Sequence, residues 1–202
     1  MKSVEAVTIY KDADQATVKR LTAGWGAEAV FALGAVVLSV IGLASTHSET
    51  FAALAAICLG AAVLLEGAAL ASCWIKFPGE RWQEGQRLEW AGGIFGKLIA
   101  GIVGIIVGIL VLFGTVPPTL LSLATLVFGA AFLFTSMVSM VPGTQELAGA
   151  GAFVLGLLSV IGLHSFTLVL VAFLGLGIIA ILSGVASERN MLHDHHVQHA
   201  TP

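Results

Sequence analysis

The sequence predicts an all-α, polytopic membrane protein with six transmembrane helices, built as three parallel helical-hairpin repeats. Two observations lead to this fold class. First, the chain of 202 residues is 57% hydrophobic and only 10% charged, whereas about a quarter of the residues of a typical soluble domain carry charge. Second, the apolar sequence of residues 38–43 recurs unchanged at residues 158–163, which indicates an internal repeat.

A second repeated segment supports the hairpin as the repeating unit. Residues 60–66 and 177–183 follow the two copies of the first segment, and residues 129–135 form a third version between them. Each version starts with glycine and continues as an apolar run. We therefore predict three hairpins, which cover residues 27–75, 93–141 and 147–186.

Six apolar segments have about the length that a transmembrane helix requires, roughly 20 residues. They are residues 27–45, 51–75, 93–113, 118–141, 147–163 and 165–186. Because every hairpin crosses twice, successive hairpins enter from the same side. The repeats are thus related about an axis along the membrane normal, and a pseudo-threefold arrangement is one natural packing.

The rest of the chain is polar. We predict an N-terminal arm over residues 1–22, helical from about Asp14, then a six-helix domain over 23–187 and a histidine-rich tail over 188–202. Residues 76–92 join the first two hairpins and mix charges with tryptophans, which predicts an interfacial helix on the membrane surface. The histidines of the tail lack the further ligands of a metal site, so no metal is predicted.

The distribution of basic residues predicts the orientation. Eight of the nine Lys and Arg residues lie in the arm, the 76–92 linker or the tail, and the three hairpin loops contain none. Basic residues accumulate on the cytoplasmic side of membrane proteins, so both termini are predicted to be cytoplasmic. The net charge of −3 is small, which suggests no nucleic-acid partner. The expected partners are the lipid bilayer and a homo-oligomer or larger membrane complex.

Small residues mark the faces on which the helices pack. In the third span, Gly101, Gly104 and Gly108 recur at spacings of three and four, a pattern that allows two helix backbones to approach closely. Lys97 lies on that face, and Glu66 lies on the equivalent small-residue face of the second span. An unpaired charge inside the bilayer costs at least ~2–3 kcal/mol, so we expect Glu66 to pair with Lys97 or to be protonated.

These residues form the candidate intramembrane polar site, for which two interpretations stay open. The pair is either a structural ion pair or a proton-titrating or ion-contacting site. Glu28 lies on the first span and is expected at a shallower depth. Glu66 aligns with Thr135 and Ser183 in the other repeats. The three side chains either form a polar ring or each form a hydrogen bond with the backbone of their own helix.

The hairpins with their glycine-rich first helices, together with residues 38–43, 60–66, 129–135 and 158–163, resemble the HdeD family of small bacterial inner-membrane proteins. This resemblance implies a multi-pass protein of the bacterial inner (plasma) membrane, associated with acid resistance. No catalytic motif is present, so we expect no enzymatic activity and no cofactor. The sequence therefore predicts a role in acid or envelope stress or as a structural membrane subunit. The alternative is a small channel or proton-coupled transporter that uses Glu66 and Lys97.

Overall fold

The computed structural model describes residues 15–76, 84–115, 119–136, 144–161 and 165–199, and within these ranges the fold is all-α. Outside the helices, these ranges contain only short turns. The helices are α2 (Gln15–Ala44), α3 (Ser48–Lys76), α4 (Glu84–Leu112), α5 (Leu120–Ser136), α6 (Thr144–Val160) and α7 (Ser165–His199). The predicted fold class is confirmed at this level.

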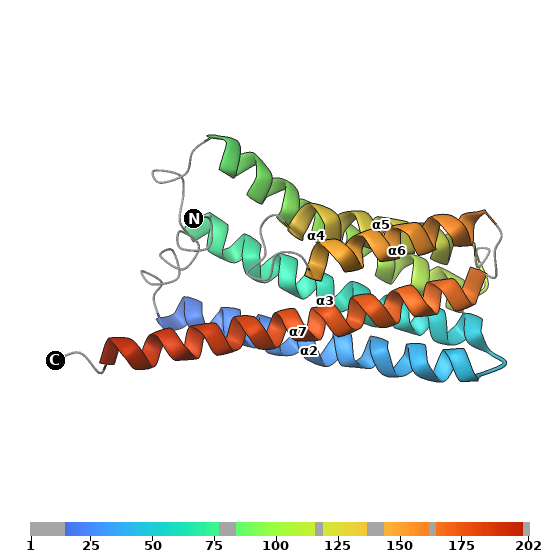
Figure 1. Ribbon diagram of the computed structural model, residues 1–202, viewed down its shortest axis with the longest axis horizontal. Coiled ribbons are helices and arrows are strands. Elements are labelled where there is room, and N and C mark those ends of the chain that lie inside the picture. Colours follow the sequence, from blue (N-terminus) through green and yellow to red (C-terminus); the bar gives the residue numbers. More distant parts are fainter. Residues whose placement is uncertain (1–14, 77–83, 116–118, 137–143, 162–164, 200–202) are drawn as a thin grey trace.

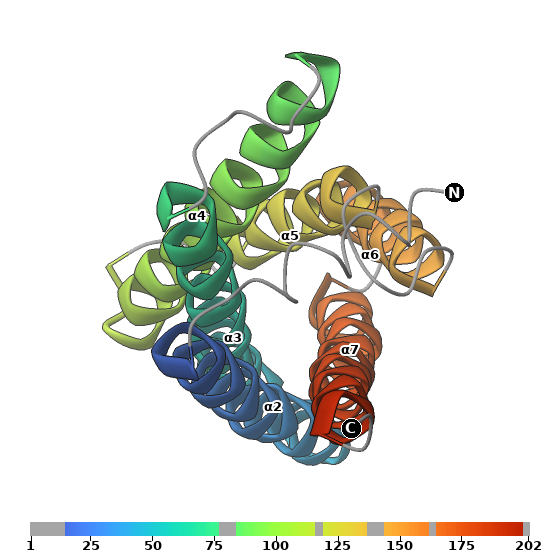
Figure 2. The same cartoon turned by 90° about the vertical axis from the view of Figure 1, so that its left-hand side faces the viewer.

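The helices form an up-and-down bundle that closes on itself. Each helix packs against the next one along the chain, and α7 packs against α2, which completes a ring. Figure 1 shows that α2, α4 and α6 start at one end of the bundle, where α3, α5 and α7 finish. Seen along the bundle in Figure 2, α3, α5 and α7 also approach one another across the middle.

Each of the helices α3, α5 and α7 has a glycine at an equivalent position. The buried residues of the three helices have the same spacing from that glycine. When Gly60, Gly129 and Gly177 are aligned, buried positions of α3, α5 and α7 coincide over several successive turns. The coinciding sets are Ala52, Leu121 and Val169; Ala56, Thr125 and Phe173; Leu59, Phe128 and Leu176; and Val63, Phe132 and Ala180. One stripe on each of these helices therefore forms most of the core, to which α2, α4 and α6 add a few small buried residues.

The shared glycine lies where each of these helices meets the first helix of another hairpin. A Cβ atom added to Gly60 would lie 2.8 Å from the carbonyl oxygen of Gly101 on α4. At Gly129 it would lie 3.0 Å from the oxygen of Gly149 on α6, and at Gly177 it would lie 3.2 Å from the oxygen of Ala32 on α2. The backbones come so close at these three crossings that no side chain fits between them.

Three of the predicted spans have the length and composition needed to cross a membrane. They are the apolar stretches Gly26–Ala44, Ser48–Ser72 and Ala91–Leu112. The apolar stretches of the other three helices are shorter, at Leu120–Phe134, Gly149–Val160 and Phe166–Leu182. The predicted span 118–141 is longer than α5, which ends at Ser136 before residues that the structure does not describe.

The described parts of the polar segments belong to the neighbouring helices. The residues of the arm from Gln15 onwards belong to α2, in agreement with the helix predicted from about Asp14. Asp14 itself lies outside the described residues. Residues 84–92 of the linker are the first turns of α4 rather than a separate helix, and they lean away from the bundle in Figures 1 and 2. The backbone of the predicted histidine-rich tail continues α7 as far as His199. A helix that meets no proline or glycine after Gly184 has no local signal to stop there.

The glycine crossing between α3 and α4 gives a direct test of this packing. Gly101→Ala should lower the melting temperature in detergent, because its Cβ would lie 2.7 Å from the oxygen of Gly60 and 2.8 Å from the backbone nitrogen of Leu64. Neither backbone atom can move without separating the two helices.

Gly96→Ala on the same helix is the matched control. No atom lies within 4 Å of the added Cβ, and alanine favours a helix by about 1 kcal/mol over glycine. This variant should melt at the same or a higher temperature. Equal melting of the two variants would contradict the close packing of α3 on α4.

Candidate functional site

Three ionisable side chains are buried inside the bundle. Glu28 comes from α2, Glu66 from α3 and Lys97 from α4, and their exposed fractions are 1%, 7% and 2%. Each of them lies 15 to 18 residues from the loop end of its own helix, so they share one level. Charged residues are rarely buried to this extent unless they are paired.

Lys97 and Glu66 form an ion pair. The Nζ atom of Lys97 donates a hydrogen bond to Oε1 of Glu66. The same Nζ atom lies 5.9 Å from the centroid of the Phe132 ring on α5, within the range of a cation–π interaction. The pairing expected from the sequence is present, and the aromatic ring adds a contact from a further helix.

The close approach of α3 and α4 positions this pair. A Cβ atom added to Gly67 would lie 3.2 Å from Cβ of Lys97, so the two helices are still nearly in contact at the level of the cluster. The glycine crossing at Gly60 and Gly101 lies within two turns of it. The small residues that the sequence marks as a packing face thus also bring the two charges together.

Glu28 belongs to the same cluster, which corrects the expectation that it lies apart at a shallower depth. It interacts electrostatically with Glu66 and Lys97. The predicted first span starts at residue 27, next to Glu28, whereas α2 already begins at Gln15. The hairpin loop between α2 and α3 fixes how these helices align. Counting residues from this loop would have placed Glu28 at the level of Glu66.

Thr135 and Ser183 are the other members of the predicted polar site, and they lie in α5 and in the middle of α7. They follow the starts of their helices by 15 and 18 residues, and Glu66 follows the start of α3 by 18 residues. Their side chains are outside the described part of the structure, so the polar ring stays a prediction. Phe132 was not predicted as part of the site. It lies one turn before Thr135, and that position in the repeat alignment is the signal that would have found it.

Hydroxyl groups are buried nearer the hairpin-loop end. Ser122 and Ser159 share a hydrogen bond of 2.6 Å between their Oγ atoms, and Thr125 donates one of 2.8 Å to the carbonyl oxygen of Leu121. Ser39 is fully buried, and its Oγ has no hydrogen-bond partner among the described residues. These groups lie inside the ring of helices, yet they are separated from the charged cluster.

Aromatic rings separate the two polar levels. Thr125, Phe128 and Phe132 follow one another along the buried face of α5, so Phe128 lies between the hydroxyl level and the cluster. Phe128 meets Phe173 of α7 edge to face, with ring centroids 5.9 Å apart and an interplanar angle of 88°. All three phenylalanines are less than 2% exposed. The described side chains therefore fill the middle of the bundle with apolar groups.

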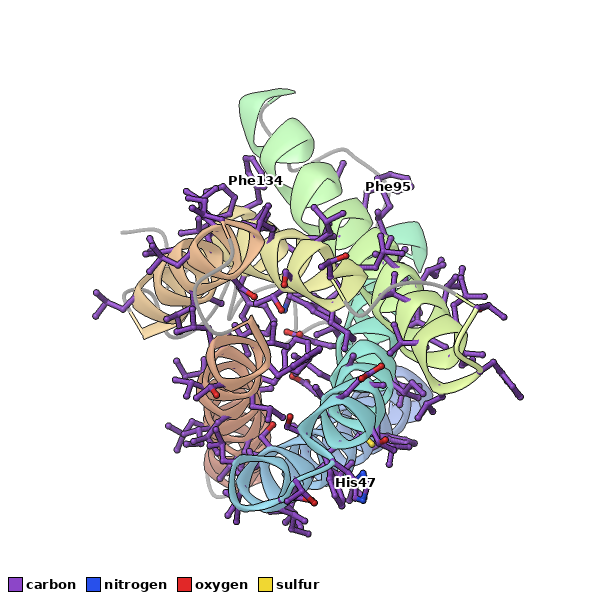
Figure 3. All side chains as sticks on the ribbon, turned by 90° about the vertical axis from the view of Figure 1, so that its right-hand side faces the viewer. His47, Phe95 and Phe134 are labelled. Carbon is purple, nitrogen blue, oxygen red and sulfur yellow. The ribbon has the colours of Figure 1, made fainter. Side chains whose placement is uncertain are left out.

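The outer surface is apolar. Large hydrophobic side chains are exposed on α2, α4, α5, α6 and α7, and Figure 3 shows Phe95 and Phe134 on the outside of the ring. His47 is exposed in the turn between α2 and α3. Within the described residues, no three His, Cys, Asp or Glu side chains are grouped so that they could hold a metal ion.

Comparisons with protein-family models, with curated proteins and with solved structures find no match to this chain.

The geometry of the cluster predicts that removing Lys97 and removing Glu66 lower the free energy of unfolding by different amounts. Lys97→Met should be strongly destabilising, because it leaves Glu28 and Glu66 buried without a counter-charge; breaking a buried pair in this way costs ~3–5 kcal/mol. Glu66→Gln should cost less, since Glu28 remains beside Lys97. The double variant should regain much of the loss. Unfolding in detergent measures all three, in a double-mutant cycle.

Two results would contradict this account. Additive losses in the single variants would show that Glu66 and Lys97 do not interact. A larger loss for Glu66→Gln than for Lys97→Met would show that Glu28 does not support the lysine. Glu49→Gln is the matched control, because Glu49 is exposed at the opposite end of the same helix.

Proposed function

We propose that this chain is a multi-pass membrane protein without catalytic activity, in which all six helices cross the bilayer. The observation that carries the proposal is the polarity of the bundle. Apolar side chains cover its outside, whereas Glu28, Glu66 and Lys97 are inside it. An apolar surface of this extent is unfavourable in water and favourable against lipid chains.

The shorter helices are compatible with spanning. The 17 residues of α5 and of α6 correspond to a length of about 25 Å at 1.5 Å per residue, and about 17 residues is the lower limit for a transmembrane helix. The common burial pattern of α3, α5 and α7 supports three parallel hairpins. The basic residues support cytoplasmic termini, and the resemblance to the HdeD family supports a place in the bacterial inner membrane.

Topology reporters test this proposal. A reporter fused after Arg189 should be active on the cytoplasmic side, and one inserted within residues 46–49 should be active outside. Insertions in the two later hairpin loops, at residues 115–118 and at His164, should also report the outside. A cytoplasmic signal from either later loop would show that the corresponding hairpin does not span the membrane.

The cellular role that we propose is protection in acid or envelope stress, or service as a structural membrane subunit. Its support is the sequence resemblance to the HdeD family together with the layer of buried phenylalanines inside the bundle. Two measurements test the role: survival of a deletion strain in acid, and identification of proteins that co-purify with the chain in mild detergent. Unchanged survival and purification of the chain alone would together contradict both roles.

The buried cluster favours a second candidate function, a small channel or proton-coupled transporter that uses Glu66 and Lys97. Ionisable residues inside a membrane often mark proton or ion pathways. The aromatic layer of Phe128, Phe132 and Phe173 argues against a continuous path, because it occupies the space between the cluster and the loop end.

A flux measurement separates the two candidates. Proteoliposomes that contain the purified protein and an internal pH dye should acidify no faster than empty liposomes after an external pH drop. The double variant Glu66→Gln, Lys97→Met is the matched control. A flux that the wild type carries and the double variant lacks would replace the first proposal by the second.

A further inference from the structure

We infer that Glu28, Glu66 and Lys97 form a binding site for one proton, which the two carboxyl groups share and which exchanges with the end of the bundle where α3 finishes. The inference concerns proton binding. It goes beyond the proposed function and does not depend on any flux across the membrane.

The charges of the cluster do not balance without a proton. Two ionised carboxylates and one ammonium group leave a net charge of −1 in a site where each residue is at least nine-tenths buried. One proton on a carboxyl group makes the cluster neutral. Burying a charge without a partner destabilises the folded state, because the apolar interior does not replace the water that solvated the charge.

The contacts of the cluster indicate which carboxyl group carries the proton. Glu66 accepts a hydrogen bond from Nζ of Lys97, which stabilises its ionised form. Glu28 is the more deeply buried carboxyl group, and it interacts electrostatically with Glu66. Since two neighbouring carboxylates disfavour each other's ionised form, the proton is favoured on Glu28.

No other described charge faces this site. Between residues 26 and 182, the other ionisable helix side chains that the structure describes are Glu49, at the loop end of α3, and the thiol of Cys58, eight residues before Glu66 on the same helix. The described parts of α5, α6 and α7 contribute none, and α5 supplies the ring of Phe132. A metal cation is disfavoured as the ligand, because the ammonium group of Lys97 already occupies the cationic position and would repel it.

Access to the proton is from one side. The side chain of Glu66 is 9% exposed, against 2% for Lys97, so Glu66 is the more accessible member of the pair. Towards the hairpin loops, Phe128 and Phe173 cover the cluster. A proton therefore enters through Glu66 and passes to Glu28.

Infrared difference spectroscopy of the purified full-length protein in lipid nanodiscs tests the inference. The carbonyl stretch of protonated carboxylic acids should show one buried carboxyl at neutral pH, with a band that shifts in D₂O. Both Glu28→Gln and Glu66→Gln should abolish it, because either change leaves a single carboxylate balanced by Lys97. Glu49→Gln should leave the band unchanged.

Two further readouts keep the test decisive. Lys97→Met should increase the band about twofold, since both carboxyl groups then bind a proton. In sealed vesicles of known orientation, the band should respond to pH on the side of the helix ends Lys76 and Glu84, and it should not respond to pH on the side of the hairpin loops.

The inference is overturned if the wild type lacks the band or if the band persists in Glu28→Gln. A response to pH on the loop side would overturn the one-sided access. Thermal melting of every variant checks that it is folded. Should one glutamine variant fail to fold, the other still gives the result, because each is expected to remove the same band.

Discussion

Close contact between helix backbones is the constraint on which the rest of this bundle depends. The outer surface is as apolar as the interior, so burial of apolar area cannot by itself select one arrangement of the helices. The crossings at Gly60, Gly129 and Gly177 can select one arrangement, because a neighbouring helix packs this closely only where there is no side chain. Packing of this kind acts through short-range dispersion contacts, which are lost when the helices separate by even a small distance.

The charged cluster is a consequence of the same contacts. Glu66 and Lys97 lie on faces of small residues, where α3 and α4 are closest, and α2 brings Glu28 to the same level. Three ionisable groups in one apolar interior hold each other in place, because each would be costly to bury alone. The phenylalanines of α5 and α7 close the cluster off from the loop end. The bundle thus has an aromatic layer between one charged level and one level of buried hydroxyl groups.

Ser39 shows how far the likeness between the hairpins extends. It and Ser159 occupy the same place in the repeated segment, and both are buried. Ser159 finds a partner in Ser122, whereas Ser39 has none among the described residues. In the alignment of the shared glycines, the residue of α7 equivalent to Ser122 is Leu170. Similar positions in the sequence therefore place a side chain at a similar depth but do not supply its partner.

The sequence by itself determined the helical fold class, the small-residue faces and the pairing of Glu66 with Lys97, because composition, residue spacing and the cost of a buried charge are local properties. It also located the start of α2 to within a residue or so. Only the tertiary structure decided that Glu28 joins the pair, that Phe132 covers Lys97 and that α7 closes the ring against α2. These contacts join residues that are far apart in the chain. The loops and the repeat alignment indicate the depth of Glu28 and Phe132, but which helices lie side by side depends on how the whole bundle packs.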